Sequence, residues 1–159
     1  MARTTVVEVN GGKYQLGRLA PDAGSFILMR LLGAGISGGS LSNDVQAPAS
    51  DAVKAPTGDE LVRAVVFAAL IKGLEFKDLQ FVQARCMAAV ARLDDPKLPD
   101  KPMPLVSDDG RWTYLEVAED IGLVMRLTVE VLVFNLADFF SGGGLGILMG
   151  SPSPKTMTP

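Results

Sequence analysis

Residues 111–144, RWTYLEVAEDIGLVMRLTVEVLVFNLADFFSGGG, decide the fold of this chain. Apolar residues fill most of the stretch, which predicts a single long helix over residues 115–140 that three consecutive glycines bring to an end. The apolar run is long enough to span a bilayer, but three charged residues interrupt it: Arg126, Glu130 and Asp138. Each charge near the centre of a membrane would cost about 2.5–3.5 kcal/mol. We therefore expect a buried helix of a soluble domain.

Upstream of this helix the chain alternates between turn signals and helical patterns. Asn10-Gly11-Gly12 lies between two β-branched or alternating stretches, which predicts a β-hairpin over residues 4–19. Residues 104–114 contain Asp-Gly at a second turn and predict another small hairpin. Apolar spacing and terminal Pro or Gly residues predict three further helices, over 21–33, 59–73 and 75–93.

These elements predict a mainly α fold, a small helical domain of about four helices with one or two short β-hairpins. We expect a single domain over residues 1–144. Residues 33–58 are small and polar, which predicts a flexible loop, and residues 145–159 predict a disordered tail.

Composition excludes several classes of partner. The formal charge is −3 and the pI is about 4.9, so the chain lacks the positive footprint that nucleic-acid binding requires. The absence of a dense Lys/Arg run also argues against binding to an anionic membrane. Cys86 is the only cysteine, so a disulfide framework is excluded, and its helical context predicts a small buried residue.

No combination of residues indicates catalysis, a cofactor or a metal. The chain has no histidine, which excludes the usual zinc sites and the usual base for a nucleophile. The pairs Asp94/Asp95, Asp108/Asp109 and Glu119/Asp120 lie in turns or at a helix start, where acidic residues have structural roles. Residues 33–38 match GxGxxG, but they follow a predicted helix instead of a strand, which argues against a dinucleotide site.

The order of the elements resembles the tail assembly chaperones of long-tailed bacteriophages and prophages, over roughly residues 5–144. Two pieces carry the resemblance best, KYQLGRLAP at 13–21 and NLADFF at 135–140. It implies a small, helical, non-enzymatic protein of the host cytoplasm that is absent from the finished virion. It also implies partners: the tape measure protein, which such chaperones keep soluble, and the tail tube protein that polymerises around it. A second copy of the chain is a further candidate partner.

A chaperone for apolar helices needs exposed apolar or Met-rich surface. Adjacent residues of a helix point about 100° apart, so Phe139 and Phe140 cannot both face one core stripe. We therefore predict partner contacts at Phe26, Met29, Phe139 and Phe140. Two alternatives remain, a structural virion component such as a tail-completion or connector protein, and an enzyme that uses the 33–38 loop.

Overall fold

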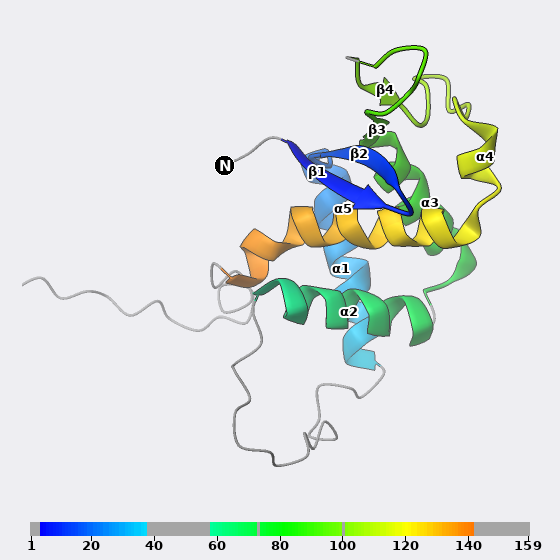
Figure 1. The fold of residues 1–159 in the computed structure, drawn as a ribbon. Helices are drawn as coiled ribbons and strands as arrows, with labels where there is room; N and C mark the ends of the chain where they lie inside the picture. The colour runs from blue at the N-terminus through cyan, green and yellow to red at the C-terminus, as the bar shows by residue number, and fades with distance from the viewer. Residues whose placement is uncertain (1–3, 38–57, 73, 100, 142–159) are drawn as a thin grey trace, which may run out of the picture.

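The computed structural model describes residues 4–37, 58–72, 74–99 and 101–141. Four strands form one antiparallel sheet, in the order β1 (Thr4–Val9), β2 (Gly12–Gly17), β3 (Val90–Arg92) and β4 (Met103–Pro104). Five helices accompany the sheet: α1 (Pro21–Ser37), α2 (Gly58–Lys72), α3 (Phe76–Ala88), α4 (Leu115–Ala118) and α5 (Ile121–Ser141). In Figure 1, α5 crosses the middle of the molecule between the β1–β2 hairpin and α2.

The predicted N-terminal hairpin is present. Asn10 and Gly11 both have positive φ, 51° and 79°, which is the backbone conformation of a two-residue type I′ turn. The turn sets Val9 opposite Gly12 and Val7 opposite Tyr14. This register buries the side chains of Val9 and Tyr14 against the helices.

The prediction of a mainly α fold is wrong, because the strands form one four-stranded sheet and the fold is mixed α/β. The predicted helix 75–93 ends at Ala88, after which Val90–Arg92 pairs with β2, so that Leu16 lies opposite Val90. β4 then adds Met103–Pro104 to the other side of β3. A strand of three residues is too short to display an alternating pattern, and its partner lies far away in sequence.

The predicted second hairpin is present in reduced form, as a turn whose arms are joined by backbone hydrogen bonds from Ser107 N–H to Arg111 O and from Thr113 N–H to Leu105 O. Val106 and Trp112 form an isolated bridge, and Gly110 has a positive φ of 82°. Met103–Pro104, just before this turn, belongs to the main sheet and not to a separate hairpin. Pro104 has no N–H to donate, which is compatible with its place on an edge strand.

Two helix boundaries also differ from the predictions. α1 continues through Gly33 and Gly35 to Ser37, at a cost of about 1 kcal/mol for each glycine within the helix. The predicted helix 115–140 is divided into α4 and α5. The division occurs at Asp120, whose Oδ1 accepts the N–H of Leu123 at 2.9 Å and so acts as an N-cap for α5.

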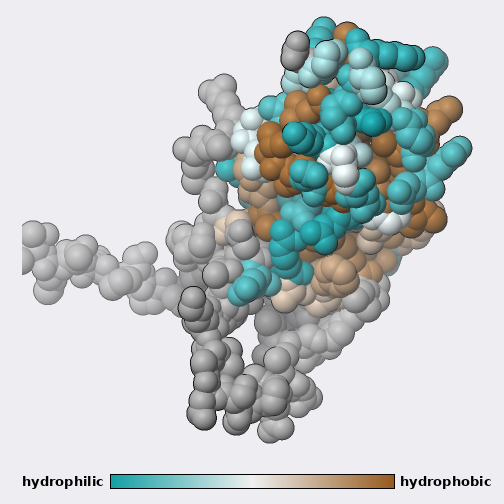
Figure 2. All heavy atoms as spheres, in the orientation of Figure 1, coloured by the Kyte–Doolittle hydropathy of each residue, from teal (hydrophilic) through white to brown (hydrophobic). Residues whose placement is uncertain are grey.

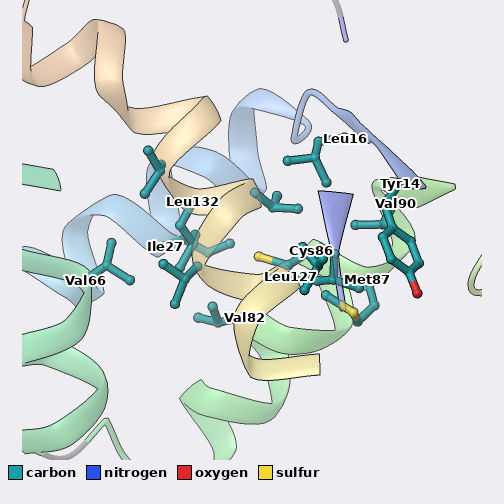
Figure 3. Close-up of a cluster of buried hydrophobic side chains, with 14 of the residues drawn as sticks. Tyr14, Leu16, Ile27, Val66, Val82, Cys86, Met87, Val90, Leu127 and Leu132 are labelled. Atoms are coloured by element: carbon teal, nitrogen blue, oxygen red, sulfur yellow. The ribbon is translucent and has the colours of Figure 1, made fainter. Parts of the chain in front are cut away.

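The core forms around α5. Leu127 and Leu132 are fully buried, and they belong to a cluster with side chains from both layers: Tyr14 and Leu16 of β2, Ile27 of α1, Val66 of α2, and Val82, Cys86 and Met87 of α3. Figure 3 shows these side chains converging from the sheet and the helices. Thr128, which is also fully buried, donates its hydroxyl to the carbonyl oxygen of Val124 at 2.7 Å.

The predicted domain limits remain predictions. Most of the predicted 33–58 loop and all of the predicted 145–159 tail lie outside the described residues. Residues 33–37, at the start of the predicted loop, are helical, because they lie within α1.

Candidate partner-binding site

A groove of about 610 Å³ lies between α2 and α5. Its walls are mainly apolar: Ala64, Phe67 and Leu70 of α2, and Gly122, Met125 and Val129 of α5. Arg63 and Arg126 complete the lining. We call this feature, defined by these eight residues, the α2–α5 groove. Its volume lies in the range of pockets that bind ligands or partner side chains.

Phe67 gives the α2–α5 groove its largest exposed apolar side chain. It is 56% exposed, although the same helix buries Val66 and Ala69 completely. Met125 is half-buried on the opposite wall, where its sulfur accepts a hydrogen bond from Gln83 Nε2 at 3.1 Å. A groove lined by both a phenyl ring and a polarisable thioether can accommodate apolar side chains of varied shape.

Three charged side chains stand at the arginine-lined part of the groove. Arg63 binds Glu130 through two parallel hydrogen bonds, Nη1 to Oε1 at 3.0 Å and Nη2 to Oε2 at 2.9 Å. Arg126, one helical turn before Glu130, reaches Oε1 through Nε at 3.0 Å. This arrangement ties α2 to α5 and fixes both guanidinium groups beside the groove.

The Glu130 side chain is only 10% exposed, so its charge depends on these partners. Burial works against its ionised form, but the hydrogen bond and charge of Arg63, and then the charge of Arg126, outweigh burial. Together they hold the pKa of the Glu130 carboxyl below its ordinary value. The carboxyl is therefore ionised at neutral pH and holds both arginines in place.

The four residues predicted to contact a partner occupy two different helices. Phe26 and Met29 lie on α1 and are 39% and 61% exposed. The Phe26 ring also packs edge-on against Phe81 of α3, with centroids 4.9 Å apart, so part of it stabilises the α1–α3 contact. Phe139 is half-buried on α5, and the side chain of Phe140 lies outside the described part of the structure.

Phe26, Met29 and Phe139 do not line the α2–α5 groove. Their role in partner binding remains a prediction. Hydrophobic residues reach the surface in several places on the face shown in Figure 2, where hydrophilic residues separate them. Exposure of single apolar residues is ordinary, so a continuous lined groove is the stronger feature.

Sequence reasoning missed most of the groove residues, above all Phe67. The segment 59–73 is apolar nearly all round, a pattern that predicts a central helix. The structure instead exposes one side of α2, including Ala64 and Phe67. One signal in the sequence could have indicated an exposed apolar surface: segment 59–73 has more apolar residues than a helix with one buried face needs.

The two stretches that carry the family resemblance meet in space. The side chain of Asn135 on α5 accepts the N–H of Leu19 at 2.9 Å and donates to the carbonyl oxygen of Gly17 at 3.2 Å. Next to this contact, the Arg18 guanidinium lies 4.4 Å from the centre of the Phe134 ring and donates to the Phe134 carbonyl oxygen. These residues join the end of β2 to α5, which gives them a structural role.

Other candidates for chemistry have structural explanations. Cys86 is fully buried, and burial raises the pKa of its thiol to about 12. Asp120 caps α5, and Asp109 accepts hydrogen bonds within its own turn. Residues 33–37 of the GxGxxG match continue α1, so their amides do not form a helix N-terminus. Within the described ranges, no group of acidic, cysteine or histidine residues could hold a metal ion.

None of the described helices is both long and apolar enough to cross a membrane. The structure defines a small mixed α/β domain with an apolar groove between α2 and α5 that is flanked by two arginines. The family model described as "Phage tail assembly chaperone protein, TAC" matches residues 10–146. Because the match covers most of the chain, this protein belongs to the phage tail assembly chaperone family. The chain matches no curated protein and no solved structure.

Proposed function

We propose that this protein binds the tape measure protein during tail assembly, keeps it soluble, and assists polymerisation of the tail tube around it. The observation that supports this role best is family membership together with an apolar groove open at the surface. A long helical protein that awaits assembly exposes apolar side chains, and a chaperone must cover them reversibly. The α2–α5 groove offers a surface of that kind.

The proposal includes a non-enzymatic role in the host cytoplasm and absence from the finished virion. The second proposed partner is the tail tube protein. It would join the tape measure protein after the chaperone has bound the tape measure protein. The chemistry of two of the earlier candidates favours binding over catalysis, because the Cys86 thiol is buried and Asp120 caps α5.

The test is co-expression of this chain with the tape measure protein of the same phage genome. The expected result is that the tape measure protein precipitates when expressed alone and co-purifies in soluble form with the chaperone. Phe67→Ser should reduce the soluble fraction. Phe76→Ser is the matched control, because Phe76 is 71% exposed but lies outside the groove.

Failure to interact would contradict the proposal. Recovery of this chain in stoichiometric amounts from purified virions would favour a structural virion component instead. Equal loss of solubility with both Phe variants would show that the α2–α5 groove has no special role in the interaction.

A further inference from the structure

We propose that the α2–α5 groove selects an amphipathic helix whose apolar face carries an acidic residue, and that Arg126 binds the acid. This inference rests on the proposed function and specifies the chemistry of the segment that is bound. The inference concerns the two arginines of the groove. A surface that bound only apolar side chains would not need them.

The charges of the groove lining have one sign. Among the described residues of the lining, Arg63 and Arg126 are the two charged members and none is acidic. Glu130 binds both arginines from outside the lining. A segment that enters the groove therefore meets positive charge beside apolar walls, and an acidic group is complementary to that surface.

Arg126 retains hydrogen-bonding capacity for a partner. A guanidinium group has five N–H donors, and the ion pair of Arg126 with Glu130 is made through Nε, at 3.0 Å from Oε1. Its side chain is 61% exposed. Among the described residues Glu130 is its one ion-pair partner, so the two Nη groups can meet an incoming carboxylate. Paired Nη donors match the two oxygens of a carboxylate in the fork geometry that arginine favours.

The shape of the site favours a helix as the occupant. Two packed helices, α2 and α5, form the walls, and a third helix fits such a groove by ridges-into-grooves packing. Apolar side chains three or four positions apart would enter between Phe67 and Met125. An acidic residue one turn away on the same face would then reach Arg126.

The experiment measures binding of overlapping, fluorescently labelled 25-residue peptides from the tape measure protein to the full-length chaperone by anisotropy. The bound peptides should contain Asp or Glu beside apolar residues at helical spacing. Arg126→Gln should weaken their binding about three- to tenfold, as expected for a partly desolvated charge pair. Arg111→Gln removes the same charge from an exposed turn outside the groove and should leave binding unchanged.

A double-mutant cycle identifies the contact directly. Replacing the peptide carboxylate with its amide should weaken binding to the wild-type chaperone, but should cause little further loss with Arg126→Gln. Additive losses would overturn the proposed pairing. Thermal melting of Arg126→Gln, expected within a few degrees of wild type because the side chain is exposed, checks the fold.

The outcomes separate this inference from the proposed function. If no peptide binds and the intact tape measure protein does not co-purify, the proposed function fails. If peptides bind wild type and Arg126→Gln equally, the tape measure role survives and the acid-selecting groove is overturned. If sedimentation shows a dimer of the free chaperone that Phe67→Ser dissociates, the occupant is a second copy and the inference is also overturned.

Discussion

Removing the Asn135 side chain should destabilise the fold by about 2 kcal/mol. Asn135 is half-buried and joins α5 to the end of β2 through the N–H of Leu19 and the carbonyl oxygen of Gly17. Asn135→Ala leaves both backbone groups without that partner, and a buried group left unpaired costs about 1–3 kcal/mol. Two groups lose a partner, but the site is only partly shielded from water, so we take about 1 kcal/mol for each group and about 2 kcal/mol in total.

The free energy of unfolding should be measured with urea and far-UV circular dichroism. For a domain of this size, about 2 kcal/mol corresponds to a fall in melting temperature of about 4–8 °C. Gln15→Ala is the control, because it removes an exposed hydrogen bond from Gln15 to Thr4, and should cost less than about 0.5 kcal/mol. If Asn135→Ala also costs less than this, the contact does not hold β2 to α5 and the explanation of the two family motifs fails.

Three further predictions concern ionisable groups. The pKa of Glu130 is lowered from 4.5, so its contribution to stability is present above that pH and is lost as pH falls through the folded-state pKa. Glu130→Gln should therefore destabilise the protein at pH 7 and differ less from wild type in urea titrations at acid pH; a constant difference would refute this. The pKa of Tyr114 is raised to about 12 by burial and by its hydrogen bond to Asp95, so stability should fall as pH rises from 10 toward 12, and Tyr114→Phe should flatten this fall in alkaline unfolding experiments. Iodoacetamide should modify Cys86 about 100-fold or more slowly in the native protein than in urea, because the thiol is buried; similar rates would contradict its burial.

Local signals in the sequence predicted the parts of the fold that depend on neighbouring residues. Asn10-Gly11 predicted the hairpin because both residues tolerate positive φ, which they adopt. The apolar run after Ile121 predicted the central helix. Burial of Cys86 followed from its place in a helical pattern, and the structure confirms it.

The sheet could not be predicted in the same way, because its extension depends on distant partners. Val90 is apolar at a position that also continues the helical spacing of α3, so the sequence fits a helix as well as a strand. Pairing with β2 makes residues 90–92 a strand and not a helix. The N–H of Gly17 donates to the carbonyl oxygen of Ala89 at 2.7 Å, and Leu16 lies opposite Val90. Tertiary pairing of this kind overrides local propensity.

The candidate site was missed for a related reason. Sequence alone does not say which side of an all-apolar helix remains uncovered, so Phe67 was indistinguishable from buried neighbours such as Val66. Partner contacts were predicted at Phe139 and Phe140 because the side chains of adjacent helical residues point in different directions. The ion pair of Arg63 with Glu130 could not be predicted either, because it depends on how α2 packs against α5.

The most direct test of the central claim is photo-cross-linking from position 67. A benzoylphenylalanine residue would replace Phe67 in one variant and Phe76 in another, since both side chains are exposed but only Phe67 lines the α2–α5 groove. After co-expression with the tape measure protein and irradiation, we expect a covalent adduct with that protein from position 67 and little or none from position 76. Cross-linking from position 76 alone, or from neither position while the two proteins still co-purify, would contradict binding through the α2–α5 groove.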